Sequence, residues 1–269
     1  MKMTRIFAAA IAALGFAGTT LAAEGEQYPP KEHHWHQDGP FGTYDRQAVQ
    51  RGYQVYQEVC ASCHSMDLMR FRNLAQRGGP FEEEAFPNPN DNPIVMQIAA
   101  SYTRVWDRDE INDDGDPVER AGLPSDPFPA PFPNVQMARA SNGGAYPPDL
   151  SLIVKARTGG ENYIYSLLTG YYDAPEDSHL APGMYYNPYF AGGAIAMAPP
   201  LAEGIIEYAD GTEATVEQMA EDVTTFLSWA GDPHMETRKQ MGVMVLLFLL
   251  IFAILVYLAY RQVWANVKH

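Results

Sequence analysis

The stretch RGYQVYQEVCASCHSMD, residues 51–67, contains a C-x-x-C-H pentapeptide. This pentapeptide is the attachment signature of a c-type haem. Two thiols three positions apart can add across the two vinyl groups of a porphyrin, and the next residue can place its imidazole below the iron. The sequence therefore predicts one covalently bound haem c, with Cys60 and Cys63 as the thioether residues and His64 as the proximal iron ligand.

Two other interpretations of the pentapeptide have to be weighed. A thioredoxin-like redox pair would need a βαβ setting, and the sequence shows none. A zinc site would need further thiols or well-spaced histidines. Because Cys60 and Cys63 are the only cysteines of the chain, a disulfide framework and a tetrathiolate metal site are excluded as well.

Helical periodicity is clear on both sides of this motif. Asp45 is the predicted N-cap of a helix whose apolar residues recur at three-to-four spacing and which leads into Cys60. Thr215 and Gln218 form a capping box in front of a second amphipathic helix, which ends at Gly231.

The rest of this region is poor in regular patterns. Residues 162–168 give a third, weaker helix candidate. Residues 81–148 are rich in Pro, Asn, Asp and Gly, which predicts irregular surface structure, and no alternating pattern is long enough for a substantial sheet. We therefore expect a mainly α fold with long irregular loops.

Both ends of the chain carry membrane signals. Lys2 and Arg5 precede an apolar run and a small-residue stretch, the layout of a secretory signal peptide over residues 1–22. Residues 241–260 contain no charge and would span about 30 Å as a helix, the thickness of a bilayer core. Export of the N-terminal side would leave the C-terminus inside. The expected organisation is a signal peptide (1–22), an exported haem domain (23–238), a transmembrane helix (239–260) and a cytoplasmic tail (261–269).

The motif does not fix the second axial ligand of the iron. Methionine is a common choice and raises the reduction potential. The methionines of the predicted signal, span and helix face, and those close to the motif, are set aside. Met197 lies in the apolar loop AIAMAPP, whose prolines would hold the thioether rigidly, and is the first candidate. The other candidates are Met184, as runner-up, and Met96, Met137 and Met235.

The combined pattern resembles the cytochrome c1 family, the haem c subunits of quinol:cytochrome c oxidoreductase (bc1) complexes, bacterial type. The resemblance covers nearly the whole mature chain. It is carried by residues 51–67, by PPDLSLIVKARTGGENYIYSLLTGY at 147–171, by YYNPYFAGGAIAMAPPL at 185–201 and by the C-terminal span. It implies a class I cytochrome c-like haem domain followed by one transmembrane helix.

The resemblance also implies roles for individual residues. Met197 takes the position of the distal axial ligand. Arg157 and Tyr163 match partners of the haem propionates, and a guanidinium fork suits a carboxylate, although a surface salt bridge is the alternative for Arg157. Asn142 and Pro147 would line the haem crevice. Some bacterial relatives hold the distal loop with an extra disulfide, which this chain lacks.

The implied function is a one-electron relay. A Rieske iron–sulfur protein would deliver an electron to the haem, and a basic cytochrome c, soluble or membrane-anchored, would receive it. The implied setting is a dimeric complex with a cytochrome b subunit in the lipid of a bacterial inner membrane, with the haem domain in the periplasm. Turnover would belong to the complex rather than to this chain alone. A stand-alone membrane-anchored monohaem carrier is the alternative, and a peroxidase or gas-binding protein would need an open sixth site.

The charge of the chain restricts its partners. It has 18 Lys and Arg against 33 Asp and Glu. All of the acids and 14 of the bases lie within residues 24–239, which therefore carry 14 − 33, or −19. Such a domain repels nucleic acid and attracts basic proteins at a salt-dependent rate. We expect two acidic runs to steer a basic cytochrome c, or else to serve only solubility: Glu82–Glu84, and Asp107, Asp109, Glu110, Asp113, Asp114 and Asp116.

Three histidines precede the haem motif. His33, His34 and His36 surround Trp35 and raise the question of a metal site. No fourth ligand is evident in the sequence. We therefore expect an exposed structural segment here.

Overall fold

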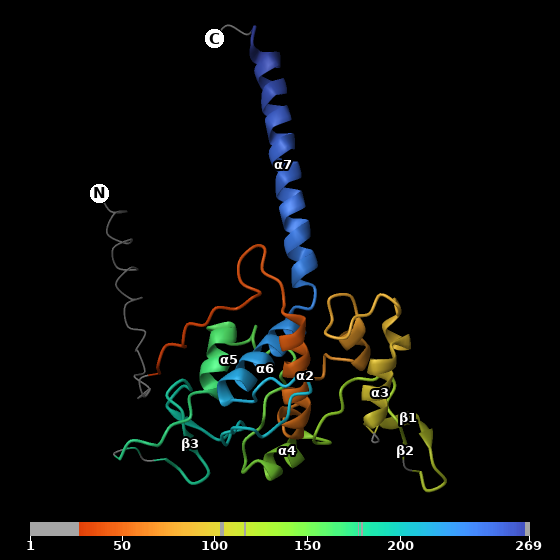
Figure 1. The fold of residues 1–269 in the computed structure, drawn as a ribbon, viewed down its shortest axis with the longest axis vertical. Helices are drawn as coiled ribbons and strands as arrows, with labels where there is room; N and C mark the ends of the chain where they lie inside the picture. The colour runs from red at the N-terminus through yellow and green to blue at the C-terminus, as the bar shows by residue number, and fades with distance from the viewer. Residues whose placement is uncertain (1–26, 103–104, 116, 177, 179, 267–269) are drawn as a thin grey trace, which may run out of the picture.

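In the computed structural model, one long helix projects from a domain of shorter helices and loops (Figure 1). The structure describes residues 27–102, 105–115, 117–176, 178 and 180–266, so the predicted signal peptide lies outside the described residues. The helices are α2 (Arg46–Glu58), α3 (Pro93–Ser101), α4 (Val135–Ser141), α5 (Gly160–Leu168), α6 (Val216–Gly231) and α7 (Met235–Trp264), with the 3₁₀ turns η1 (Cys60–Ser62), η2 (Phe71–Ala75) and η3 (Pro89–Asp91).

Strands are few in the described part of the chain. β1 (Val105–Ile111) pairs antiparallel with β2 (Pro117–Arg120), and β3 (Tyr185–Tyr186) pairs antiparallel with β4 (Ala194–Ile195). The second sheet has Tyr185 opposite Ile195. The expected mainly α fold without a substantial sheet is confirmed.

Helix α2 begins as the cap signal predicts. The Asp45 carboxylate accepts hydrogen bonds from the backbone N–H groups of Gln47 (2.9 Å) and Ala48 (3.3 Å). This bonding satisfies donors that the first turn of a helix leaves free. The helix ends at Glu58, directly before the turn that carries the cysteines.

Helix α6 crosses α2 at very close range. Thr215 caps α6 by accepting from the Gln218 N–H at 3.1 Å, and the helix ends at Gly231, as predicted. At the crossing, a Cβ on Gly52 would lie 2.0 Å from the carbonyl oxygen of Asp222. Only a glycine lets the two backbones approach this closely. The position of the haem motif at the end of α2 therefore depends on this contact.

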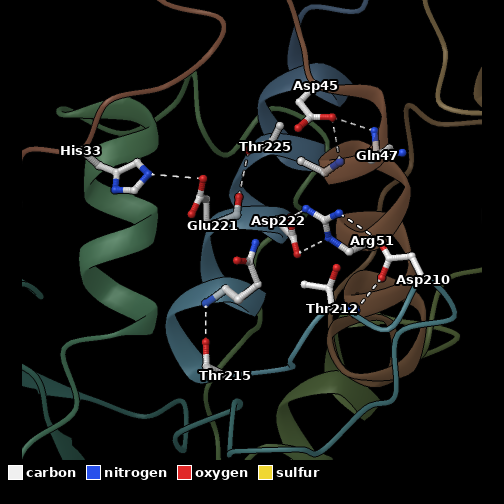
Figure 2. A network of polar contacts seen from close by, with 12 residues as sticks. His33, Asp45, Gln47, Arg51, Asp210, Thr212, Thr215, Glu221, Asp222 and Thr225 are labelled. Carbon is white, nitrogen blue, oxygen red and sulfur yellow. Dashed lines mark hydrogen bonds and ion pairs between the residues drawn. The ribbon is translucent and has the colours of Figure 1, made fainter.

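An ion pair lies beside the same crossing (Figure 2). Arg51 of α2 donates from Nε and Nη2 to the two carboxylate oxygens of Asp222 in α6, at 2.9 and 2.8 Å. Its Nη1 reaches Asp210 at 3.1 Å. Burial raises the pKa of Asp222, and Arg51 opposes that shift. The bidentate pair fixes the rotation of α2 against α6.

Helix α7 has two different parts. Met235 is buried in the domain core, whereas the apolar side chains from Met241 onward are exposed, apart from the half-buried Val243. An 18-residue window of this helix has a mean hydropathy of 3.0 and is not buried. Length and composition make α7 the candidate membrane span among the described residues, and Figure 1 shows it leaving the domain.

One expectation is wrong in part. Residues 81–148 are not wholly irregular, because they contain α3, α4 and the β1–β2 hairpin. Helix α3 starts with Asn92 as its cap and Pro93 at its first position, a pair that is also typical of loops. Strand β1 has the sequence VWDRDEI, which lacks apolar alternation. These elements were missed because their local signals are ambiguous.

Candidate haem-binding site

The haem motif forms a tight turn at the end of α2. The N–H groups of Cys63 and His64 both donate to the Cys60 carbonyl, at 3.1 and 2.9 Å. Both cysteines are free thiols of intermediate exposure. The turn therefore presents two thiols and an imidazole from a single loop.

The environment of the first cysteine is apolar. Burial raises the pKa of the Cys60 thiol, and the neighbouring Cys63 raises it further. Val59 and Ala61 pack with Cys60 against the core. Such a site stabilises an uncharged sulfur, as in a thioether, over a thiolate.

The ring of His64 is oriented by a backbone carbonyl. Its Nδ1 lies 2.8 Å from the Pro148 oxygen. A carbonyl oxygen can only accept, so Nδ1 carries the proton and the lone pair of Nε2 stays available for a metal. Burial lowers the pKa of His64, although the bond to Pro148 opposes this shift. The neutral ring is the form that ligates iron.

Asp149 holds the segment with the Pro148 carbonyl against the haem motif. Its carboxylate accepts from the Ser65 hydroxyl (2.8 Å) and the Asp67 N–H (2.7 Å). It also accepts from the Ser151 N–H at 2.9 Å. Burial alone would raise the pKa of Asp149, but the hydrogen bonds from Asp67, Ser151 and Ser65 hold that pKa below its ordinary value. The position of the Pro148 carbonyl is thereby fixed.

The methionine candidates differ in their surroundings. Met235 is 6% exposed and belongs to the hydrophobic core. Met96 and Met137 are each half exposed, on helices α3 and α4. Met184 lies in the turn before β3 and Met197 in the bend after β4, both with intermediate exposure. The two loop methionines remain the candidates for an axial ligand.

The Met197 loop is tied to the region of α5. Tyr171, which follows α5, donates from its hydroxyl to the Met197 carbonyl at 3.0 Å. Asn187, fully buried in the β3–β4 turn, donates to the Leu167 carbonyl at 2.8 Å. Both ends of the loop are therefore fixed by α5 and the segment that directly follows it.

Tyr163 interacts electrostatically with both Arg157 and Tyr171. Burial raises the pKa of Tyr163, and the Arg157 guanidinium opposes this shift. Burial also raises the pKa of Tyr171, and Tyr163 adds to it. Arg157 is exposed and donates to the Ala156 carbonyl at 3.2 Å. It forms no ion pair with another described residue, so its guanidinium could bind an added carboxylate.

The two expected crevice residues lie in different settings. Asn142 ends α4, and its amide donates to the Ala138 carbonyl at 2.7 Å. Pro147 is half-buried and directly precedes Pro148, the partner of His64. The structure therefore connects Pro147 to the haem motif, while the hydrogen bond of Asn142 stays within its own helix.

The N-terminal histidines do not converge on one point. His33 packs between the rings of Trp35 (4.5 Å) and Tyr165 (4.8 Å), and it lies 3.6 Å from a Glu221 carboxylate oxygen. His34 and His36 are exposed. Among the described residues, no group of three or more His, Cys, Asp or Glu side chains could hold a metal ion.

The donor set fits a covalently bound haem. Two free thiols and a histidine with a free Nε2 come from one turn, and a thioether and a guanidinium come from loops around α5. Sequence reasoning missed the three residues that support these groups, Tyr171, Asn187 and Asp149. In the sequence, these three residues are marked only by being polar and by lying within segments 147–171 and 185–201, which resemble the cytochrome c1 family.

The comparisons with known proteins identify a family of haem proteins. A model of the cytochrome c1 family matches residues 35–267. The chain is similar to a protein named cytochrome b/c1 from Bradyrhizobium diazoefficiens, with 46% identity over 94% of this chain. It spans only 38% of that longer protein.

Two mitochondrial proteins are matched over most of their length. Cytochrome c1-2, heme protein, from Solanum tuberosum is 44% identical over 95% of this chain and 93% of its own. Cytochrome c1, heme protein, from Saccharomyces cerevisiae is 46% identical over 94% of this chain and 77% of its own. The resemblance therefore extends from the haem motif through α7.

Proposed function

The chain belongs to the cytochrome c1 family, and from that premise we propose that it is the haem c electron-transfer subunit of a quinol:cytochrome c oxidoreductase complex. The main support is the bond from His64 Nδ1 to the Pro148 carbonyl, beside two free cysteines. It leaves one nitrogen lone pair for iron at the position that the C-x-x-C-H motif requires. When bound, the haem would supply a one-electron iron couple.

Each residue of the site has a physical task in this proposal. Cys60 and Cys63 would hold the porphyrin edge covalently, and His64 would provide a nitrogen ligand. Met197 would provide a thioether ligand, which favours electron transfer over gas binding. Arg157 and Tyr163 would bind the propionates. Pro147, directly before Pro148, and Asn142 would line the haem crevice.

The proposed partners follow from the family. A Rieske iron–sulfur protein would be the electron donor, and a basic cytochrome c the acceptor. A cytochrome b subunit would accompany both, in a dimeric complex. The net charge of −15 suits a basic acceptor because opposite charges speed the encounter.

The proposed location is a bacterial inner membrane. Helix α7 would be the anchor, with the haem domain (23–238) in the periplasm and the tail (261–269) in the cytoplasm. The orientation rests on the predicted signal peptide at residues 1–22. Arg238 and Arg261 flank the apolar run on opposite sides, so local charge does not decide it.

Purification in mild detergent tests the proposal. Covalent haem c on this chain should co-elute with a b-type haem protein and an iron–sulfur protein. Elution of the haem chain alone would favour a stand-alone anchored carrier. The spectrum of the reduced protein should not change on adding carbon monoxide, because Met197 would occupy the sixth position. A strong shift would contradict the relay function.

A further inference from the structure

A groove lies where α7 leaves the haem domain. One wall is the loop before α2, which Figure 1 shows rising toward the base of α7. The other wall is the first three turns of α7. The groove is lined by Pro40, Phe41 and Thr43 of the loop and by Lys239, Val243 and Met244 of the helix.

The loop is held in a defined conformation. Lys239 donates from its ammonium to the carbonyls of Gln37 (2.5 Å) and Gly42 (3.3 Å). The Thr43 N–H donates to the His36 carbonyl at 3.2 Å, which closes the loop. A Cβ at Gly42 would lie 2.1 Å from the Asp38 carbonyl oxygen, so the turn requires glycine there. The loop is therefore built onto α7.

Phe41 projects from this held loop into solvent. It is 79% exposed, the highest value among the large apolar side chains that the structure describes. Burial of an apolar side chain is favourable, so a ring exposed on a fixed loop would gain free energy if an apolar surface covered it. Met244 is 64% exposed and lines the same groove, so Phe41 and Met244 form an apolar patch of the kind that marks an interaction surface.

The depth of the loop identifies that surface. Val243 and Met244, which face the loop across the groove, already belong to the charge-free run 241–260. At 1.5 Å per residue, Met244 lies only about 4–5 Å inside the start of that run. Phe41 therefore lies at the level where the proposed span enters the lipid.

The charges around the groove suit a lipid phosphate. Glu236 is neutralised by Arg46 at 2.7 Å, and Asp232 by Arg238. Lys239 forms no ion pair with any residue that the structure describes, and two carbonyls hold it at the rim. An unpaired cation above an apolar groove matches the order of charge and hydrocarbon in a phospholipid.

We propose that the loop 37–43 is a second membrane contact, in which Phe41 enters the bilayer interface and a phospholipid occupies the groove between the loop and α7. This inference rests on the proposed membrane span of α7. Two contacts, rather than one flexible stem, would fix the tilt of the haem domain above the membrane. The exposed edge of the cofactor would then face its partners at a constant height.

Site-specific photocrosslinking tests the contact in native membranes with the full chain. Phe41 is replaced by the photoreactive p-benzoylphenylalanine, which suits an exposed aromatic position. After irradiation, mass spectrometry of the peptide should find a phospholipid adduct. The matched control is Ile111, an apolar residue that is 68% exposed on strand β1, far from α7 in Figure 1, and it should give no lipid adduct.

Two positions within α7 separate the possible failures. Leu250 and Phe252 lie about 200° apart around the helix, so one neighbouring helix cannot cover both. Lipid adducts there without one at position 41 would overturn the second contact and leave the anchor intact. A protein adduct at position 41 would also overturn it, because a subunit would then cover the groove. Failure at all three positions would refute the span itself.

Discussion

The hydroxyl of Tyr171 donates a hydrogen bond of 3.0 Å to the backbone carbonyl of Met197. Tyr171 stands three residues after α5, and burial raises the pKa of its phenol, so it stays a neutral donor. The bond joins the loop of the proposed distal ligand to the segment that directly follows α5, the helix that carries Tyr163. The thioether position is therefore set by a residue that would not itself touch the iron.

Tyr171→Phe should loosen the Met197 ligation without removing the ligand. The loss of this bond costs about 1–3 kcal/mol, because the carbonyl is left without its partner. We expect a lower reduction potential and a measurable reaction with carbon monoxide in the reduced protein. Tyr172→Phe, at a 52% exposed neighbour, is the control and should leave both unchanged. A native potential in Tyr171→Phe would show that packing alone holds the loop.

Met197→Leu should remove the distal ligand while keeping the volume of the side chain. Thioether ligation raises the haem potential, so we expect a large drop in a redox titration and full carbon monoxide binding. Met184→Leu is the matched variant, because Met184 is also half-buried in a loop. If only Met184→Leu lowers the reduction potential, Met184 rather than Met197 is the distal ligand.

The cap signals explain why the two main helices could be predicted. Asp45 and Thr215 act on backbone groups two or three residues away, so a local pattern contains the whole interaction. Tyr171 and Asn187 act on residues 26 and 20 positions away, and no local pattern reports such contacts. The same reason applies to Asp149, whose partners Ser65 and Asp67 precede it by 84 and 82 residues.

Gly52→Ala should strongly destabilise the haem domain. The added Cβ would lie 2.0 Å from the Asp222 carbonyl oxygen, so α2 and α6 must separate. Overpacking of this kind costs about 1–3 kcal/mol or more. We expect a lower yield of haem-loaded protein and a lower melting temperature.

Gly231→Ala is the control for this prediction. Gly231 is the last residue of α6, whereas Gly52 lies in α2, and a Cβ at Gly231 would meet Lys155 at 3.5 Å, an ordinary contact. Its φ is not positive, so alanine should cost little stability there. Equal losses in both variants would mean that the domain tolerates an added methyl group at neither position, and the close approach of α2 and α6 would not explain the loss.

Asp126→Asn should destabilise the protein in a pH-dependent way. Arg120 donates to both carboxylate oxygens of Asp126, at 2.6 and 3.0 Å, and the Leu123 N–H adds a bond at 2.7 Å. The bonds from Arg120 lower the pKa of Asp126. Its contribution is complete above the unfolded pKa of about 3.9 and is lost as the pH falls through the lower folded value.

Thermal unfolding of the Asp126→Asn variant and of the unmodified protein, at pH 7 and at about pH 3, measures the contribution of Asp126 to stability. At pH 7 we expect the variant to lose about 1.5–3 kcal/mol, the value of hydrogen bonds to charged groups. The difference in stability between the variant and the unmodified protein should be smaller at the lower pH. Asp114→Asn, on an exposed turn, should cost little at either pH. A gap that stays constant with pH would show that the charge of Asp126 is not responsible.

Glu83→Gln together with Glu84→Gln should slow electron transfer to a basic cytochrome c. Glu84 is exposed and Glu83 half-buried, whereas Glu82 accepts a bond from the Gly78 N–H at 2.7 Å and is left intact. Removal of two negative charges weakens steering, so the rate at low salt should fall and its salt dependence flatten. Glu207→Gln with Glu213→Gln changes the net charge equally at two other exposed acids. Equal slowing by both pairs would mean that net charge steers the partner, and an unchanged rate and slope would exclude docking at Glu83 and Glu84.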